Sequence, residues 1–282
     1  MEGVDIDMKI FAKQKSTDIA EVSATHQKFL QDYKKNKVKI RIAQWSIFVF
    51  FLFIWEFSSR VGWLNSFIFS SPSRVLKTIV NMGRDGSLFY HTGITLLETF
   101  VSFALVIIIG LAVAVLLWWN DSISKVLEPY LVILNSLPKT ALAPIFIVWL
   151  GNNMKTIIVA AVSVAVFGSI ITLYSNFQAV EEDKMKLIYT FGGTKKDILF
   201  KVILPSNIPS IISVMKVNIG LSLVGVIIGE FLAAKAGLGY LIIYGSQVFK
   251  LDWVIMSIVI LCIVASGLYG ILSYVEKRVK RS

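Results

Sequence analysis

Long apolar blocks run through this sequence, and each is close to the length that a helix needs to cross a lipid bilayer. About 20 helical residues cross the ~30 Å hydrocarbon layer. Apolar residues (AVILMFWYC) make up 56% of the 282 residues and charged residues only 16%, and the mean hydropathy is +0.73. A soluble domain carries more charge, so the sequence predicts an all-helical, polytopic membrane protein. Six spans are expected, at residues 42–57, 92–119, 123–150, 155–174, 208–231 and 254–275.

The positive charge of the chain gathers beside these spans. The net charge is +10, and much of it lies in residues 9–41, 184–201 and 277–281. No module that combines aromatic and basic residues accompanies them, so nucleic-acid binding is not expected. Six spans place both termini on one side, and Lys and Arg are more frequent in the segments that then face the cytoplasm. We therefore expect a protein of the cell (inner) membrane with both termini in the cytoplasm.

The composition offers little for catalytic or metal chemistry. Cys262 is the only cysteine, and the two histidines, His26 and His91, lie far apart. No cluster of nucleophiles, bases or metal ligands is visible, so we expect neither an enzyme nor a metal site. The sequence also lacks a G-x-x-x-x-G-K-[ST] phosphate loop. If ATP powers this protein, another chain binds it.

The segments between the spans divide the chain further. Residues 1–41 form a polar tail, which is either an amphipathic helix on the cytoplasmic leaflet or a solvated helix or disordered tail. Residues 42–91 hold the first span and an external segment, in which Ser71 begins a peripheral or re-entrant helix. Residues 92–275 form the transmembrane core, and 276–282 are a basic cytoplasmic C-terminus. The tail residues that recur at helical spacing are Ile19, Val22, His26, Phe29, Leu30 and Tyr33.

A polar interruption at residues 176–205 lies within the core. Residues with an apolar side at helical spacing precede Gly192, which can cap or turn the chain. A second short amphipathic helix follows at 198–203, and Pro205 and Pro209 are expected to end it. This pattern predicts a helix–glycine–helix unit that is suited to docking in the groove of a partner protein.

This loop resembles the E-A-A-x-x-x-G-x(9)-I-x-L-P signature of ABC importer permeases. Gly192 stands at the glycine position, and Val202 and Leu204-Pro205 close the motif after the same nine-residue spacing. The front departs from the signature, because Lys186-Leu187-Ile188 stands in place of Glu-Ala-Ala. The acidic cluster 181–183 lies earlier, so the motif does not place the carboxylate that contacts the ATPase.

Other segments are similar to the nitrate, taurine and alkanesulfonate branch of this family. Their shared order and spacing carry the resemblance across most of the chain beyond the tail. The matching positions are Thr95-Leu96, Leu137-Pro138, Ala141-Leu142-Ala143-Pro144, Trp149-Leu150-Gly151, Glu230 and Gly237-Leu238-Gly239.

The resemblance implies a type I ABC importer permease fold and a set of partners. Two permease copies pair, usually as a homodimer, and two cytoplasmic ATPase subunits beneath them hold ATP and Mg. An extracytoplasmic binding protein delivers the solute, and the permease itself binds no cofactor. A coupling helix at about 182–191 transmits ATPase closure to the pore. The residues implied at the ATPase contact are Glu182, Lys186, Leu187, Gly192, Gly193, Val202, Leu204 and Pro205.

The nature of the solute depends on the charge inside the spans. Lys139 follows Pro138 in the third span, where it either lines the pathway and attracts an anionic solute or snorkels to an interface or pairs with an acid. An anion suits the sulfonate, taurine or nitrate branch, and a pyrimidine or other small organic nutrient is the alternative. An ion-coupled secondary transporter is less favoured, because it would show internal repeats and functional acids at mid-membrane.

Further candidates for the pathway or gate lie in the second and fifth spans. Asn218, Ser222 and Gly225 share a face of the fifth span that meets either the pathway or a neighbouring helix, since Gly225 begins a G-x-x-x-G pattern. Glu98 either pairs with a basic residue or lines the cavity. Glu230 either holds an external gate, contacts the binding protein, or is an ordinary interfacial carboxylate.

Overall fold

The computed structural model is helical throughout the part of the chain that it describes. It describes the backbone of residues 2–279 and the side chains of residues 29, 32, 33, 35–65 and 67–279. The chain forms two units, Met1–Leu64 and Asn65–Ser282. The predicted all-helical fold class is confirmed.

The first unit is one long helix, α1 (Glu2–Val61). Its part Lys35–Val61 is apolar and long enough to cross a membrane, and the predicted first span lies within it. Aromatic side chains such as Trp45 and Phe50 are exposed there, as expected for a surface that meets lipid. The side chains that carry most of the predicted amphipathic pattern lie outside the described residues: Ile19, Val22, His26 and Leu30.

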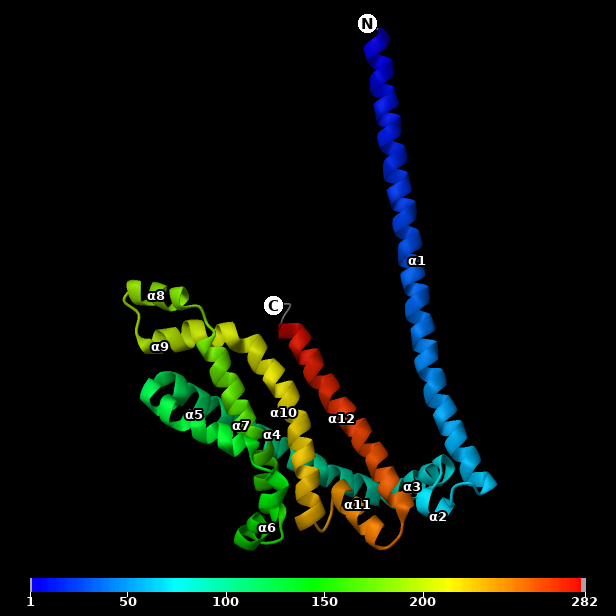
Figure 1. Ribbon diagram of the computed structural model, residues 1–282, viewed down its shortest axis with the longest axis vertical. Helices are drawn as coiled ribbons and strands as arrows, with labels where there is room; N and C mark the ends of the chain where they lie inside the picture. The colour runs from blue at the N-terminus through cyan, green and yellow to red at the C-terminus, as the bar shows by residue number, and fades with distance from the viewer. Residues whose placement is uncertain (1, 280–282) are drawn as a thin grey trace. The chain divides into compact units, whose positions relative to one another are not determined.

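The second unit is built from the remaining helices, which are joined by short connections (Figure 1). Two short helices precede its first long one. The elements are α2 (Ser66–Phe69), α3 (Pro72–Arg84), α4 (Ser87–Trp119), α5 (Asp121–Ser136), α6 (Lys139–Leu150), α7 (Met154–Gln178), α8 (Glu182–Thr190), α9 (Lys195–Ile198), the π-helical turn Leu199–Ile203, α10 (Leu204–Ala233), α11 (Leu238–Gln247) and α12 (Leu251–Val279).

The described part of the chain contains five helices that are long and apolar enough to cross a membrane, or six if α5 and α6 form one broken span. The predicted third span is not a continuous helix, because α5 and α6 meet at 95°. The break falls at Leu137, whose backbone is extended, as is usual for the residue before a proline. The interruption expected from the prolines is thus confirmed at Pro138, whereas the other two prolines of this segment lie inside α5 and α6.

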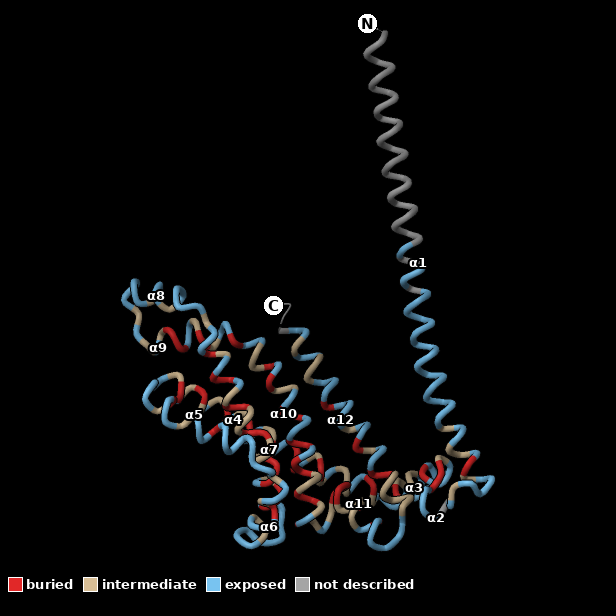
Figure 2. The backbone as a smooth tube through the Cα atoms, in the orientation of Figure 1, coloured by how far each residue is buried: buried red, intermediate tan, exposed pale blue. Residues whose placement is uncertain are grey.

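The core of the second unit lies between α4, α7 and α10, which make its most extensive helix contacts. Buried residues line the facing sides of these helices (Figure 2). A Cβ atom on Gly225 would lie 2.6 Å from Ala161 Cα, and one on Gly229 would lie 2.9 Å from Ile157 Cα. The G-x-x-x-G pattern therefore lets α10 approach the backbone of α7 closely.

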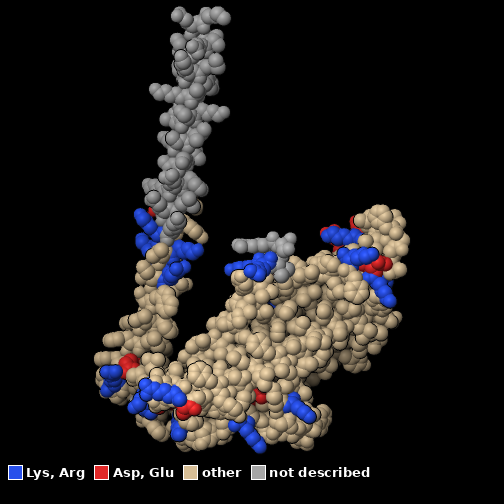
Figure 3. Space-filling model, turned by 180° about the vertical axis from the view of Figure 1, so that it is seen from behind, with Lys and Arg blue, Asp and Glu red and all other residues tan. Residues whose placement is uncertain are grey.

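The two ends of the second unit carry its charged residues, and Figure 3 shows a broad uncharged surface between them on one face. At one end Asp252 of α12 accepts hydrogen bonds from Arg74 at 2.8 Å and from Ser70 at 2.5 Å. Ser71 caps α3 there, as the sequence predicted. Lys216 pairs with Glu276 at 2.7 Å, which places the last turns of α12 beside the first half of α10.

Candidate functional site

The polar loop folds into α8, a glycine turn and α9. Gly192 has a φ of +78°, a left-handed conformation that glycine adopts without steric cost. The Gly193 N–H donates to Ile188 O and the Gly192 N–H to Tyr189 O, both at 2.9 Å. These two bonds form a Schellman motif, which satisfies the last carbonyls of α8. The predicted turn at Gly192 is confirmed, and Gly193 is required as well, because a Cβ there would lie 2.4 Å from Ile188 Cγ2.

The two sides of α8 have different surroundings. Met185 and Ile188 pack against the hydrophobic core at the ends of α4, α5, α7 and α10. Leu187 lies on the side that faces away from this core, Tyr189 lies one turn after Met185, and Phe191 follows at the C-cap. Leu187 is 55%, Tyr189 54% and Phe191 80% exposed. Exposed apolar residues on a helix that is anchored from behind are typical of a docking surface.

Charged side chains surround this apolar surface. Lys186 lies 3.3 Å from Glu182 and 3.4 Å from Asp183, and Lys184 lies 3.3 Å from Glu181. All of them are solvent-exposed, so these pairs add little stability. Glu182 and Lys186, which the family resemblance implies at an ATPase contact, are therefore free to exchange these local partners for groups of a docked protein.

The second half of the loop continues directly into α10. Thr194 and Asp197 form a capping box at the start of α9, and Lys195 donates to Trp119 O at 2.8 Å. The expectation that Pro205 and Pro209 end this helix is wrong. Pro205 falls in the first turn of α10 and Pro209 lies inside it.

A change of helical register and local hydrogen bonds accompany the helix where it passes these prolines. The turn Leu199–Ile203 is π-helical, and the Leu204 N–H donates to Leu199 O. The Ser206 hydroxyl donates to Val202 O and the Asn207 amide donates to Ile203 O. These side chains add hydrogen bonds to the turn that precedes Pro205, whose ring supplies no N–H. Val202 and Leu204 are half-buried in this junction, which joins α8 and α9 to α10 without a flexible break.

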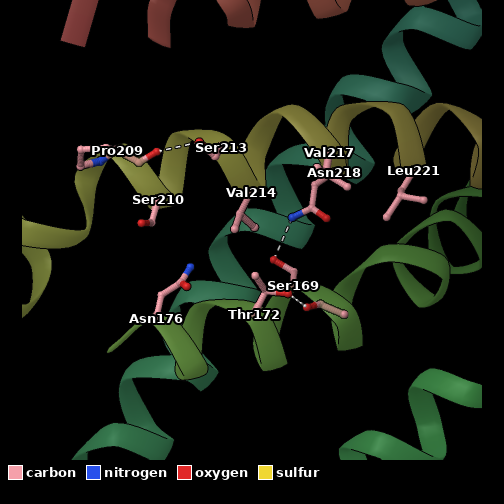
Figure 4. A pocket seen from close by; sticks show the side chains of 11 residues that line it. Ser169, Thr172, Asn176, Pro209, Ser210, Ser213, Val214, Val217, Asn218 and Leu221 are labelled. Atoms are coloured by element: carbon pink, nitrogen blue, oxygen red, sulfur yellow. Dashed lines mark hydrogen bonds between the residues drawn. The ribbon is translucent and has the colours of Figure 1, made fainter. Parts of the chain in front are cut away.

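A groove of about 580 Å³ lies between α7 and α10. Across it, the Asn218 amide donates to Ser169 Oγ at 2.8 Å, and Figure 4 shows this bond joining the two helices. Asn218 and Ser169 are each only 2% exposed. The groove is lined by Gly168, Ser169, Thr172 and Asn176 of α7 and by Pro209, Ser210, Ser213, Val214, Val217, Asn218 and Leu221 of α10.

Only one of the four predicted pathway or gate residues on α10 lines this groove. Asn218 does so, whereas Gly225 packs against Ala161. Ser222 is fully buried, and its hydroxyl has no hydrogen-bond partner among the described residues. Ser169, Thr172 and Asn176 of α7 were not predicted from the sequence. Their spacing of i, i+3 and i+7 in an apolar helix was a signal that could have indicated them.

Lys139 lies at the first residue of α6, directly after Pro138. Its ammonium donates to the carbonyl oxygens of Leu134, Asn135 and Leu137 and lies 5.4 Å from the Phe167 ring centroid. These carbonyls end α5, where a cation is favoured by the helix dipole. The contacts that Lys139 makes in this structure are therefore those of a helix cap.

Glu98 and Glu230, for which separate roles were predicted from the sequence, lie together in a buried cluster at the opposite end of the unit from α8. Glu230 Oε1 accepts from the Thr95 hydroxyl at 2.6 Å, and Oε2 accepts from the Gly239 N–H at 2.5 Å. The carboxyl of Glu98 is a neighbour of Glu230, and its buried Oε2 has no hydrogen-bond partner among the described residues. Glu98 is 2% and Glu230 1% exposed.

This cluster holds the N-terminus of α11. The Gly237 N–H donates to His91 Nδ1 at 3.0 Å and the Leu238 N–H to Thr95 Oγ1 at 2.8 Å. With Gly239 on Glu230, three consecutive N–H groups that a helix start leaves unsatisfied find side-chain acceptors. A Cβ on Gly237 would lie 2.3 Å from Glu230 Cδ. The glycines of this turn are therefore required by the close approach of the carboxyl group.

Comparison with known proteins agrees with this architecture. The chain is 29% identical over 195 residues to the formylaminopyrimidine transport permease protein ThiX of Halalkalibacterium halodurans, covering 68% of this chain and 76% of the relative. It is 24% identical to the putative aliphatic sulfonates transport permease protein SsuC of Escherichia coli, covering 78% and 84%. An inward-facing structure of the MetNI methionine ABC transporter shares the fold, with a TM-score of 0.61 and 20% identity over 70% of this chain and 98% of that chain.

The family model of the binding-protein-dependent transport system inner membrane component matches residues 106–281. This range contains α8, the glycine turn, the groove and Glu230. The resemblance to ABC importer permeases expected from the sequence is confirmed, and this chain belongs to the family of binding-protein-dependent transport system inner membrane components.

Proposed function

We propose that this chain forms the transport pathway of an ATP-driven importer, in which two ATPase subunits dock on the α8 surfaces of two paired copies. ATP and Mg would be bound by the ATPase subunits, and a binding protein would deliver the solute from outside. The observation that carries the proposal is α8 itself. It is anchored by Met185 and Ile188 and exposes Leu187, Tyr189 and Phe191.

The connection from α8 to α10 gives this surface a mechanical role. The Schellman turn, the capping box and the π-helical junction leave no freely rotating link between α8 and α10. A displacement of α8 by a closing ATPase dimer would therefore move α10, which lines one side of the groove. Rigid-body movement of this kind is how transporters alternate access to a central site.

The α8 end of the second unit would face the cytoplasm, because the ATPase subunits lie there. The Lys216–Glu276 pair brings the end of α12 to this side, so the basic C-terminus would be cytoplasmic as well. The excess of Lys and Arg in the same set of segments supports this orientation, with the N-terminal tail on that side too.

The cluster around Glu230 would then lie at the external end. It fixes α11 to α4 and α10 through contacts between residues more than 130 positions apart in sequence. In this position the cluster would hold the outer part of the pathway closed while the groove is open to the inside.

We propose that the solute is a small organic molecule rather than an inorganic anion such as nitrate. The expectation of an anion relied on Lys139, whose ammonium is occupied by the carbonyl groups that end α5. The names of the relatives point to two classes, formylaminopyrimidines and aliphatic sulfonates. Both remain within the proposed function, and the polar groove beside Asn218 is the place where they would be distinguished.

Replacing Gly192 tests the proposed coupling. A Gly192→Val variant places a β-branched residue at a φ of +78°, which costs about 1–2 kcal/mol or more and distorts the turn. We expect uptake and binding-protein-stimulated ATP hydrolysis by the assembled transporter to fall at least about tenfold. Gly270→Val is the control, because a Cβ at that helical glycine of α12 meets nothing within 4 Å. Normal coupling in Gly192→Val would contradict the proposal.

A further inference from the structure

The groove between α7 and α10 has no ionisable side chain among the residues that line it. Its polar groups are hydroxyls and amides, and its apolar side is formed by Val214, Val217 and Leu221 (Figure 4). Solute sites that combine apolar walls with a few placed polar groups recognise their ligands by hydrogen bonding and shape.

Several of these polar groups keep hydrogen-bonding capacity for a solute. Thr172 donates its hydroxyl proton to a carbonyl of its own helix, and Ser213 shares its proton between Pro209 O at 3.0 Å and the Glu276 carboxylate at 3.4 Å, which leaves both hydroxyl oxygens as acceptors. Asn218 uses one amide hydrogen on Ser169 and retains its amide oxygen. Asn176 and Ser210 lie on opposite helices, and neither side chain hydrogen-bonds to another described residue. The groove thus offers donors and acceptors together.

The lysines next to the groove are already paired. Lys216, one residue before Val217, lies 2.7 Å from Glu276, and both side chains are mostly buried. Toward α8 the groove continues into a smaller hollow of about 240 Å³, where the exposed Lys184 lies 3.3 Å from the carboxylate of Glu181, which lines the same hollow and offsets its charge. An anion that entered between α7 and α10 would lose water without gaining an unpaired cation, which is unfavourable.

We infer that this groove is the solute-binding part of the pathway and that it accepts an uncharged, hydrogen-bonding organic solute and disfavours anions. The inference rests on the proposed importer function and selects, within it, the neutral class over the sulfonate class. Asn176, Ser210 and Asn218 supply the donors and acceptors, and Val214, Val217 and Leu221 supply the apolar wall.

Charge-selective thiol labelling of the assembled transporter tests this inference without knowledge of the natural solute. Ser210→Cys is placed in a Cys262→Ser background, since Cys262 is the only native cysteine. Its labelling rates with neutral methyl, anionic sulfonatoethyl and cationic trimethylammonioethyl methanethiosulfonates are each divided by the rate for a free thiol in solution. Ser122→Cys, an exposed position outside the groove, is the matched control, and Thr172→Cys replaces Ser210→Cys if that variant does not assemble.

At Ser210→Cys we expect the neutral reagent to exceed the anionic one by roughly tenfold after normalisation, because the groove offers the anion no counter-charge. At Ser122→Cys the normalised rates should agree within about threefold. A normalised neutral-to-anionic ratio at Ser210→Cys no greater than that of Ser122→Cys would overturn the inference, as would failure of all three reagents to react.

Uptake by the intact transporter then identifies the solute class. ATP-driven accumulation of a formylaminopyrimidine, with little ethanesulfonate, supports the inference, and preferential accumulation of ethanesulfonate overturns it. If neither probe accumulates, the labelling ratio decides. Binding-protein-stimulated ATP hydrolysis is measured on the same preparations. If the binding protein stimulates ATP hydrolysis but labelling favours the anionic reagent, only the inferred solute class is refuted. If the wild type shows no stimulated ATP hydrolysis, the proposed importer function is refuted.

Discussion

The exposed ring of Phe191 provides the most quantitative test of the α8 surface. Phe191 is 80% exposed, and α8 carries no fully buried residue. Full burial of a phenylalanine side chain contributes about 1.5–3 kcal/mol, so a partner that covers the exposed part would gain about 1–2.5 kcal/mol. Phe191→Ala should therefore weaken ATPase binding by about 5- to 60-fold, since about 1.4 kcal/mol corresponds to tenfold in affinity.

The assay is titration of the purified ATPase subunit onto the permease in lipid nanodiscs. Phe89→Ala is the matched control, because Phe89 is 71% exposed but lies on α4, at the opposite end of the unit from α8. The thermal stability of both variants should stay near that of the wild type, since neither ring is buried. The reasoning is refuted if Phe191→Ala binds the ATPase as tightly as the wild type, or if Phe89→Ala loses as much affinity.

Three further substitutions test the packing and the polar clusters. Glu230→Ala leaves the buried Gly239 N–H and Thr95 hydroxyl without their acceptor, which costs about 1–3 kcal/mol for each group. The thermal unfolding midpoint of this variant should fall well below that of Glu128→Ala, a control at an exposed site. Equal midpoints would show that the hydrogen bonds to Glu230 do not stabilise the protein. Gly225→Ala should destabilise the folded protein by about 1–3 kcal/mol, because its Cβ meets Ala161. Gly220→Ala on the same helix, where a Cβ meets nothing within 4 Å, should instead stabilise it by up to ~1 kcal/mol. Denaturant unfolding that ranks the two variants in the reverse order would refute the close contact between α7 and α10. Lys139→Met should lower stability by about 0.3–1 kcal/mol through loss of the α5 cap without changing solute preference, and a switch in preference measured by competitive uptake would restore Lys139 as a pathway residue.

Features that depend on neighbouring residues could be predicted from the sequence. The long apolar blocks predicted the membrane helices, because the bilayer fixes the length of a spanning helix. The turn at Gly192 followed from one residue that tolerates a left-handed backbone. The break at Pro138 followed from the restriction that proline places on the residue before it.

The error at Pro205 and Pro209 has a physical cause that the sequence rules did not include. Proline normally ends a helix because it lacks an N–H and crowds the preceding turn. Here a π-helical turn changes the register, and the side chains of Ser206 and Asn207 bond to backbone carbonyls in that turn. The identity of these two polar residues was visible, but their role depends on the register of the turn.

The contacts between distant residues could not be predicted from one sequence. Thr95 and Glu230 are 135 positions apart, and nothing local to either predicts their hydrogen bond. The groove residues of α7 show a polar spacing in the sequence, yet which face of α7 meets α10 is set by the small residues Ala161 and Gly225. The sequence therefore predicted the helix–glycine–helix unit and one groove residue, Asn218, but not the groove as a whole.

ATP-dependent uptake into proteoliposomes tests the central claim most directly. The vesicles contain this chain and its ATPase partner, with ATP enclosed on the ATPase side and the binding protein and solute on the other. We predict accumulation only when ATP and the binding protein are both present, and none when an ion gradient replaces ATP. Accumulation driven by an ion gradient without ATP would contradict the assignment of this chain as the driven subunit of an ABC importer.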